Sequence, residues 1–454
     1  MMAERLVIIG GVAAGAKAAA KARRMRPDLD IVVYQDETEV SYSACGQPYV
    51  LSGVIENRDK IVIRRPQEFA SDNIRALTRH RVEAIDVATR QIRVNDLSVN
   101  GAQTTAYDKL ILATGARPII PAVDGIELEG VLTLRSISDL DRFKSTIDIL
   151  KPGKAAIIGA GYIGLELAET FHELNVKTTI IEKFDRILPK FDEEMAQQVS
   201  AHLVENNVEL ITGQGLAGIT GENGRVVSVT TESGLERDVD LVVVAIGVRP
   251  NTDLAKDGGI AIGETGAIAV DRKMQTRVPG VYAAGDCCET VDRVTGKTTW
   301  LPLGDIANLQ GRIAGENAAG GDASFPGVLG TAIFKTFDLN VACTGLSETA
   351  ARQAGYEAVS VNVNRSDRAR YYPGGNSLAI KLVADKQGGR LLGAQVIGPG
   401  KADKMIDIAA TALLGRLTCE DLENADLAYA PPFSPVLSPM ITAAGALNSK
   451  VGNR

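Results

Sequence analysis

The chain has 454 residues, and its 49 Lys and Arg against 56 Asp and Glu give a formal net charge of −7. This mildly acidic balance excludes a general nucleic-acid-binding surface, and 45% hydrophobic residues exclude a disordered chain. At roughly 100 to 200 residues per domain, the length predicts two to four domains.

Cysteine and histidine are scarce, with five and three residues respectively. No C-x-x-C pair or Cys/His cluster occurs, which excludes a zinc ribbon, an iron–sulfur cluster and a disulfide scaffold and predicts that no metal is bound. Reduced thiols and a cytoplasmic location are expected. The first apolar stretch, residues 6–9, is too short for a signal peptide, and no apolar run is long enough to span a membrane.

The first predicted unit, residues 6–15, is a β-branched strand, a glycine turn and the start of an alanine-rich helix. Gly10 and Gly15 occupy the outer positions of a dinucleotide-binding motif whose middle position is a valine. The next predicted strand ends at Gln35, followed by Asp36. Either side chain can hydrogen-bond a ribose hydroxyl, and we favour Gln35 because it stands where the strand ends.

A second unit of the same kind begins near residue 155. Its motif has all three glycines of G-x-G-x-x-G, namely Gly159, Gly161 and Gly164. These allow a tight turn, close approach of a pyrophosphate and packing of helix on strand. The following strand ends at Glu182, whose carboxylate suits a ribose 2′-hydroxyl and favours NADH, although Lys183 and Arg186 leave NADPH open.

Three further strands end in glycine turns, at residues 109–115, 241–247 and 280–286. Beyond Pro326 the pattern changes to alternating strands followed by a helix near residues 403–414, which indicates a separate α+β domain. The sequence therefore predicts an α/β protein with two Rossmann-like dinucleotide-binding domains and a C-terminal α+β domain.

Over nearly its whole length, this order of motifs resembles the pyridine nucleotide–disulfide oxidoreductases. Residues 41–49, Ser-Tyr-Ser-Ala-Cys-Gly-Gln-Pro-Tyr, resemble the single-cysteine branch of coenzyme A disulfide reductases, NADH-dependent persulfide or polysulfide reductases, and NADH oxidases and peroxidases. Residues 429–434 resemble the first two groups in particular. The resemblance implies a homodimer in which the FAD domain spans 1–120 and 249–325, the NAD(P) domain 121–248, and the dimerisation domain 326–454.

The resemblance also implies cofactor contacts. FAD contacts are implied for Gly10, Gly15, Gln35, Thr114, Gly115, Asp286 and Ala307. A helix beginning after Leu303 would direct the positive end of its dipole at the flavin. NAD(P)H contacts are implied for Gly159, Gly161, Tyr162, Gly164, Glu166, Glu182 and Gly247. Among these, Tyr162 resembles the gate residue over the flavin, and Glu166 resembles the acid that contacts the nicotinamide.

Cys45 is the predicted redox residue. Two-cysteine relatives carry the partner five positions later, where this chain has Val50. The oxidised form of Cys45 must therefore be a mixed disulfide, a persulfide or a sulfenic acid. A following helix and a nearby flavin are expected to lower its pKa. The other four cysteines are predicted to pack.

A departing thiolate needs a proton, and the C-terminal segment contains no histidine to supply it. Tyr429 and one of the pair Tyr371–Tyr372 are the predicted substitutes, with Tyr372 favoured. The resemblance implies that they reach across the dimer interface to Cys45 of the partner subunit. Interface packing is the alternative role for such tyrosines.

Lys17, Lys21 and Arg24 repeat at i, i+4 and i+7 and so share one face of the first helix. A solvated face explains such a stripe equally well. The resemblance places a coenzyme A pyrophosphate there, with Ser41 and Asn308 along the pantetheine arm.

The leading hypothesis is an NAD(P)H-dependent flavoprotein reductase that passes electrons through FAD and Cys45 to a disulfide, persulfide or polysulfide, coenzyme A-linked by resemblance. The first alternative is an NADH oxidase in which Cys45 cycles through sulfenic acid. The second alternative is a flavin-binding carrier or redox sensor without turnover. No fused sulfurtransferase domain is expected.

Overall fold

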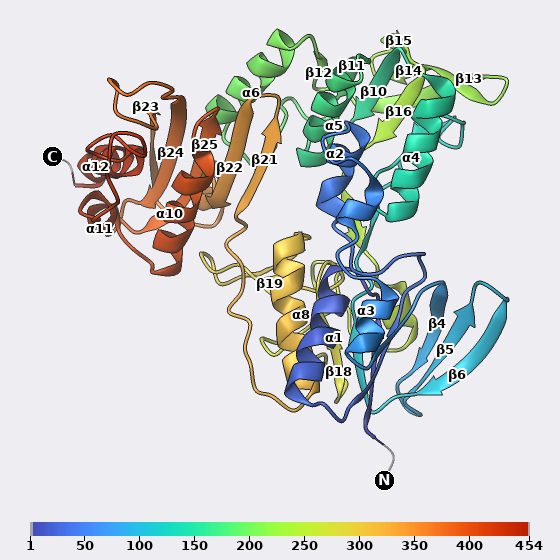
Figure 1. Ribbon diagram of the computed structural model, residues 1–454. Coiled ribbons are helices and arrows are strands. Elements are labelled where there is room, and N and C mark those ends of the chain that lie inside the picture. Colours follow the sequence, from blue (N-terminus) through green and yellow to red (C-terminus); the bar gives the residue numbers. More distant parts are fainter. Residues whose placement is uncertain (1–2, 453–454) are drawn as a thin grey trace.

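The computed structural model describes residues 3–452, and its first two units each contain a five-stranded parallel sheet (Figure 1). The orders are β18-β7-β1-β2-β3 and β12-β11-β10-β16-β9. In each sheet the strand that leads into a glycine motif is central: β1 lies between β2 and β7, and β10 lies between β11 and β16. The predicted α/β fold with two nucleotide-binding units is confirmed.

The first unit is formed by two stretches of the chain. Its first stretch contains β1 Arg5–Ile9, α1 Ala13–Met25, β2 Asp30–Tyr34, η1 Ala44–Gly46, α2 Gln47–Leu51, η2 Arg58–Ile61, α3 Pro66–Ser71, β3 Ile74–Leu77, β4 His80–Asp86, β5 Gln91–Asp96, β6 Gly101–Ala106, β7 Lys109–Leu112 and β8 Ala116–Pro118. Its second stretch contains β17 Val248–Pro250, α7 Asp253–Asp257, β18 Val281–Ala283, β19 Thr290–Val291, β20 Thr298–Thr299 and α8 Gly304–Ala318. Strand β18 pairs with β7 and so returns the chain to the first sheet.

The second unit is inserted between these stretches. It contains β9 Val131–Leu132, α4 Ile137–Leu150, β10 Lys154–Ile158, α5 Tyr162–Glu173, β11 Lys177–Ile181, α6 Glu193–Glu205, β12 Glu209–Ile211, β13 Leu216–Glu222, β14 Arg225–Thr231, β15 Glu236–Asp238 and β16 Leu241–Val244. The strands of its parallel sheet are almost fully buried, as expected for a sheet covered on both faces.

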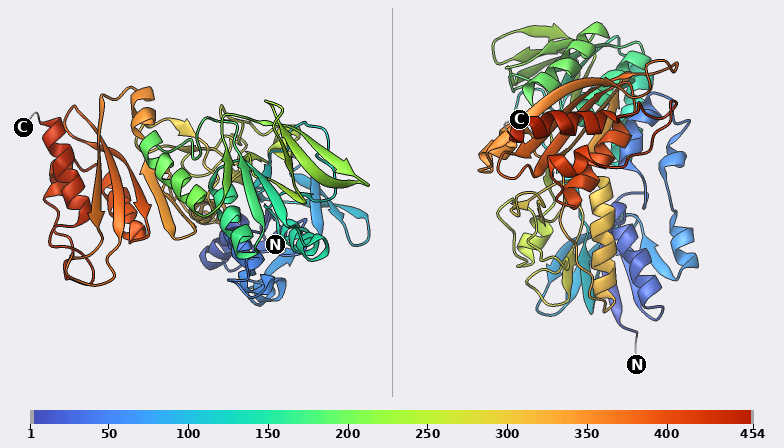
Figure 2. Two further views of the ribbon diagram at one scale, coloured as in Figure 1. Left: turned by 90° about the horizontal axis from the view of Figure 1, so that it is seen from above. Right: turned by 90° about the vertical axis from the view of Figure 1, so that its left-hand side faces the viewer.

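The C-terminal domain is a five-stranded antiparallel sheet of order β21-β22-β25-β24-β23. It contains β21 Ala332–Thr336, β22 Leu339–Gly345, α9 Glu348–Gln353, β23 Ala358–Ser366, β24 Ser377–Asp385, β25 Leu391–Gly398, α10 Ala402–Leu414, α11 Cys419–Glu423 and α12 Pro439–Val451. Seen from above, α12 forms the outer end of the molecule, and the second unit lies beyond the other side of the sheet (Figure 2). No helix within residues 3–452 is long and apolar enough to cross a membrane.

Candidate functional site

The turn after β1 is closed so tightly that it requires glycine. Gly10 has φ +96°, and a Cβ there would lie 2.1 Å from the carbonyl oxygen of Ala113. A Cβ on Gly15 would lie 1.8 Å from the carbonyl oxygen of Gly10. The ends of β1 and β7 are therefore in direct contact, and helix α1 begins against the same turn. This edge of the sheet is where a nucleotide binds in doubly wound folds.

The second unit repeats this arrangement. A Cβ on Gly159 would lie 2.6 Å from the carbonyl oxygen of Ala245, and one on Gly164 would lie 2.2 Å from the carbonyl oxygen of Gly159. Gly161 has no atom within 4 Å of its Cβ position, so the turn is open where a pyrophosphate would approach. Gly247 has φ +111° and is exposed at the end of β16.

Gln35 and Glu182 also occupy equivalent positions in the two units. The Gly11 amide donates to Oε1 of Gln35 at 2.7 Å, and the Ala160 amide donates to Oε2 of Glu182 at 2.7 Å. Both side chains are almost fully buried. Each therefore ties its glycine turn to the end of the neighbouring strand, in addition to any contact with a ribose.

Thr114 and Gly115 follow β7, and a residue far along the chain holds them. The Thr114 hydroxyl donates to the carbonyl oxygen of Asn251 at 2.7 Å, and the Asn251 side-chain amide donates back to the Thr114 carbonyl at 2.8 Å. Gly115 has φ +67° and open space at its Cβ position. Asn251 has no sequence signal, because its role depends on the return of the chain through β17.

Asp286 lies at the end of the same sheet, after β18. Its Oδ2 accepts a hydrogen bond from Arg135, and its backbone carbonyl accepts one from the indole of Trp300 at 2.9 Å. Its Oδ1 is buried and has no hydrogen-bond partner among the described residues. A buried carboxylate oxygen without a partner is costly, so a ligand hydroxyl is expected to bind there. The ribitol hydroxyls of FAD fit this requirement.

Helices α1 and α8 lie side by side on this sheet (Figure 1). A Cβ on Gly311 would lie 2.2 Å from the carbonyl oxygen of Ala14, and one on Gly315 would lie 2.3 Å from that of Ala18. Ala307, one turn before Gly311, is buried and contacts the turn after β18. Small residues at every fourth position therefore let the two helices approach closely, with both N-termini near the ends of the strands.

Cys45 lies at the N-terminus of helix α8. The Cβ position of Gly304, the first residue of that helix, lies 4.0 Å from Sγ of Cys45. The cysteine loop begins at Ser41, which has φ +50° and donates its amide to the carbonyl oxygen of Gly11 at 2.8 Å. The loop that carries the thiol is thus fixed to the first glycine turn.

The electrostatics of Cys45 differ from the prediction. Although Cys45 is exposed as a residue, the protein around its sulfur shields the thiol from part of the water and so raises its pKa. The negative charge of Glu166 raises the pKa further, while Arg135 lowers it. The prediction of a lowered pKa is therefore wrong for the chain alone. It considered a following helix and the flavin, whereas acidic side chains, including Asp286 and Asp305, also face the thiol.

The predicted gate residue over the flavin and the acid predicted to contact the nicotinamide are both on α5. Tyr162 is its first residue, and Glu166 lies one turn later. Burial, with the charge of Glu169, raises the pKa of Glu166 to about 7. Helix α5 also contacts the cysteine segment, since the Thr170 hydroxyl donates to the carbonyl oxygen of Pro48 at 3.3 Å.

The C-terminal tyrosines are exposed, and two of them are neighbours. The hydroxyls of Tyr371 and Tyr429 lie 3.4 Å apart, and this hydrogen bond raises the pKa of Tyr371. Tyr372 makes a backbone hydrogen bond with Ala369 instead. Within one chain, Tyr371 is therefore the neighbour of Tyr429.

The predicted coenzyme A residues, apart from Ser41 in the cysteine loop, lie on the paired helices α1 and α8. Lys17 and Arg24 are exposed, whereas Nζ of Lys21 lies 3.0 Å from a carboxylate oxygen of Glu316 on α8. Asn308 is exposed, and its amide donates to the carbonyl oxygen of Gly304 at 2.8 Å. Lys21 is thus partly neutralised, and Lys17 and Arg24 carry the accessible positive charge of the stripe.

Comparison with known proteins agrees with this geometry. The family model for pyridine nucleotide-disulphide oxidoreductases matches residues 4–303, and the model for their dimerisation domain matches residues 331–441. The chain is 40% identical over 448 residues to the NAD(P)H coenzyme A polysulfide/persulfide reductase of Pyrococcus horikoshii, covering 98% of this chain and 99% of that protein. It is 37% identical over 452 residues to the NADH oxidase of Methanocaldococcus jannaschii, covering 99% of this chain and 100% of that protein.

A solved structure shares the fold over nearly the whole chain. The NAD-dependent persulfide reductase from A. fulgidus matches with a TM-score of 0.95 and 42% identity, covering 98% of this chain and 83% of that chain. This chain therefore belongs to the pyridine nucleotide-disulphide oxidoreductases and is an FAD-dependent enzyme that uses NAD(P)H.

Proposed function

We propose that the protein is an NAD(P)H-dependent reductase of coenzyme A-linked persulfides, polysulfides or disulfides, with Cys45 as its redox cysteine. The observation that carries the proposal is the position of Cys45, an exposed thiol at the N-terminus of α8. Cys287, Cys288 and Cys419 are buried, and Cys343 lies in the C-terminal domain. The second sulfur of any disulfide at Cys45 must therefore come from the substrate or from another molecule.

The chemistry divides between the cofactors and the chain. When bound, FAD accepts two electrons from NAD(P)H and donates them to sulfur. With a persulfide, the Cys45 thiolate attacks the sulfur that is bonded to the coenzyme A moiety, and hydrosulfide departs. The resulting mixed disulfide takes up two electrons and one proton, which restores the thiolate and releases the coenzyme A thiol. The dipole of α8 and the charge of Arg135 favour the thiolate and oppose the acidic groups that raise its pKa.

Lys17 and Arg24 support a phosphate-bearing substrate, because both are exposed cations on α1. Helix α1 lies beside α8, whose first residue is next to the sulfur of Cys45. The name of the Pyrococcus horikoshii relative agrees with coenzyme A as the carrier. Lys21 contributes less to this patch because Glu316 pairs with it.

We propose that Tyr429 and Tyr371 donate the proton to the departing group at Cys45 of the partner subunit. Tyr371 lies in the loop from β23 to β24, and Tyr429 lies in the loop from α11 to α12, both at the outer end of the C-terminal domain (Figure 1). Helix α2, which follows Cys45, lies on the opposite side of this domain, beyond β21 (Figure 1). The match to a dimerisation domain supports a homodimer that brings the two regions together.

Tyr429→Phe is expected to slow disulfide turnover by about 10²-fold, the usual contribution of a general acid, and to leave the dimer intact. Steady-state kinetics with coenzyme A disulfide and size-exclusion chromatography measure the two properties. Tyr372→Phe is the matched control and should retain the normal rate. An unchanged rate in Tyr429→Phe would leave packing as the role of that tyrosine.

Glu166 gives the reductive step a pH dependence. We expect the rate of flavin reduction by NADH to rise as pH increases through about 7, because ionised Glu166 stabilises the positively charged ring of the NAD⁺ product. Stopped-flow absorbance of the flavin across pH 6 to 8 measures this rate. Glu166→Gln should be flat over the same range, and an identical pH profile in both proteins would remove Glu166 from this role.

An NADH oxidase is the second candidate, favoured by the name of the Methanocaldococcus jannaschii relative. Anaerobic reduction by NADH followed by separate additions of coenzyme A disulfide, polysulfide and air distinguishes the two functions. The proposal predicts rapid reoxidation by the sulfur compounds. Reoxidation by air alone would establish the oxidase instead.

A further inference from the structure

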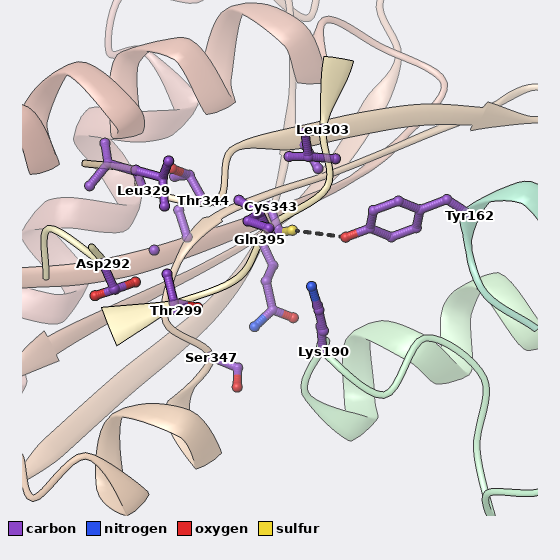
Figure 3. A pocket seen from close by; sticks show the side chains of 16 residues that line it. Tyr162, Lys190, Asp292, Thr299, Leu303, Leu329, Cys343, Thr344, Ser347 and Gln395 are labelled. Atoms are coloured by element: carbon purple, nitrogen blue, oxygen red, sulfur yellow. Dashed lines mark hydrogen bonds between the residues drawn. The ribbon is translucent and has the colours of Figure 1, made fainter. Parts of the chain in front are cut away.

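Tyr162, the first residue of α5, is held by two side chains of the C-terminal domain. Its ring stacks on Phe334 with centroids 4.9 Å apart and an interplanar angle of 28°. Its hydroxyl lies 3.6 Å from Sγ of Cys343 (Figure 3). A residue of the nucleotide-binding unit is therefore positioned by a different domain.

The Tyr162 ring borders a cavity of about 180 Å³ between the domains. Tyr162 and Lys190 reach it from the second unit, and Leu303, the residue before α8, lines it from the first (Figure 3). Cys343 and Gln395 line it from the C-terminal sheet. The ring thus has open space beside it, and its present position is set by its contacts rather than by close packing on all sides.

Strand β21 forms a fixed wall along helix α5. The Thr336 hydroxyl donates to the carbonyl oxygen of Leu165 at 3.2 Å, and the Phe337 amide donates to Oε2 of Glu169 at 3.0 Å. Glu169 also pairs with Lys335. Cys343 is fixed to the same wall, because it pairs with Ala332 across the β21–β22 ladder. The helix and the two side chains that hold Tyr162 therefore move together.

The surroundings of Cys343 suit a neutral hydrogen-bonding group rather than a redox thiol. Burial raises the pKa of Cys343, which keeps the thiol protonated. A protonated, enclosed thiol is a poor nucleophile but exchanges a hydrogen bond with a hydroxyl. This assigns Cys343 a role that the sequence did not reveal, since as an isolated cysteine it was predicted only to pack.

We propose that Cys343 is a positioning residue for the nicotinamide half of the reaction: with Phe334, it holds Tyr162 against the C-terminal domain and so keeps the nicotinamide site accessible. This inference rests on the proposed function and on the predicted position of Tyr162 between the flavin and the nicotinamide. When the thiol is removed, the ring is free to occupy that site and competes with the dinucleotide.

The test uses the FAD-loaded dimer. Cys343→Ala is expected to raise the Kd for NAD⁺ by about 2- to 10-fold, the worth of one hydrogen bond, when binding to the oxidised protein is measured by titration calorimetry. Cys343→Ser restores the normal Kd because it keeps a donor. Reoxidation of the reduced enzyme by coenzyme A disulfide stays unchanged. Cys419→Ala, a buried cysteine of the same domain, is the matched control.

A double-mutant cycle separates positioning from a general structural effect. Tyr162→Phe removes the other partner of the hydrogen bond, so it should match Cys343→Ala, and the double variant should be no worse than either. Fully additive effects, or a Kd in Cys343→Ala equal to that of Cys419→Ala, would overturn the inference. Tyr162→Ala removes the competing ring, so Cys343→Ala combined with Tyr162→Ala should regain the normal Kd, and a Kd that stays raised in this double variant would overturn the inference. The proposed function is tested separately, since a reduced normal enzyme that coenzyme A disulfide does not reoxidise would be a failure of the proposed function whatever the Kd values.

Discussion

Cys45→Ser is expected to lose coenzyme A disulfide reduction by at least about 10³-fold while still binding FAD and accepting electrons from NADH. The physical reason is that a serine hydroxyl is not ionised near neutral pH and cannot form a disulfide with the substrate. Asp286 and the first glycine turn are held by Arg135 and Gln35 through hydrogen bonds that do not involve Cys45, and serine is close to cysteine in size, so the FAD site should remain intact.

Two measurements check this result: the flavin absorbance after anaerobic addition of NADH, and the release of coenzyme A thiol in steady state. Cys419→Ala serves as the control, because Cys419 is buried in α11 and should not affect either measurement. Thiol release from Cys45→Ser at the normal rate would exclude Cys45 as the nucleophile.

Lys381→Ala is expected to lower the free energy of unfolding by about 3–5 kcal/mol, the usual effect of removing one partner from a buried charge cluster. The Lys381 side chain is only 2% exposed and lies within 4 Å of Asp192, Glu194 and Glu348. Asp192 also accepts hydrogen bonds from the amides of Glu348 and Thr349, at the start of α9. The cluster therefore joins α6 of the second unit to the C-terminal domain.

A matched exposed pair provides the control for this prediction. Lys386 lies 3.1 Å from Glu357 with its side chain 44% exposed, so Lys386→Ala should cost at most about 1 kcal/mol. The urea midpoint of the FAD-loaded dimer compares the two variants. Equal midpoint shifts would show that the Lys381 cluster contributes no more than a surface pair.

The same cluster gives the stability a pH dependence. Burial alone would raise the pKa of both Asp192 and Glu348. Amide hydrogen bonds and the charge of Lys381 instead hold the pKa of Asp192 below its ordinary value of 3.8. A hydrogen bond from the Ser360 hydroxyl and the charge of Lys381 hold the pKa of Glu348 below its ordinary value of 4.5. Because the pKa values of these two carboxyl groups are lower in the folded protein than in the unfolded chain, the cluster stabilises the fold fully above about pH 4.5. This stabilisation is lost as pH falls through the pKa values of the folded protein.

The parts of the site that the sequence predicted well depend on local backbone geometry. Gly10, Gly15, Gly159 and Gly164 are required by turns formed within a few residues, so their spacing alone indicates a nucleotide-binding turn. The paired positions of Gln35 and Glu182 followed from the repeat, because both stand at the end of the second strand of a unit.

Other parts could not be predicted because they depend on contacts between distant segments. The spacing of Ser136 and Asp139 is typical of a capping box at the start of a helix. No local pattern indicates that the neighbouring Arg135 donates a hydrogen bond to Asp286, which lies far away in the sequence. The same holds for the contact of Cys343 with Tyr162. The raised pKa of Cys45 depends on acidic residues from several elements, which no local pattern contains.

Mass spectrometry tests directly whether Cys45 is the redox cysteine. The enzyme, with its flavin oxidised and Cys45 as a free thiol, is incubated with coenzyme A disulfide. We predict one coenzyme A moiety attached to the peptide that contains Cys45, and its release when NADH is added anaerobically. Attachment to Cys343 or another cysteine, or an adduct on Cys45 that NADH does not remove, would exclude Cys45 as the redox cysteine.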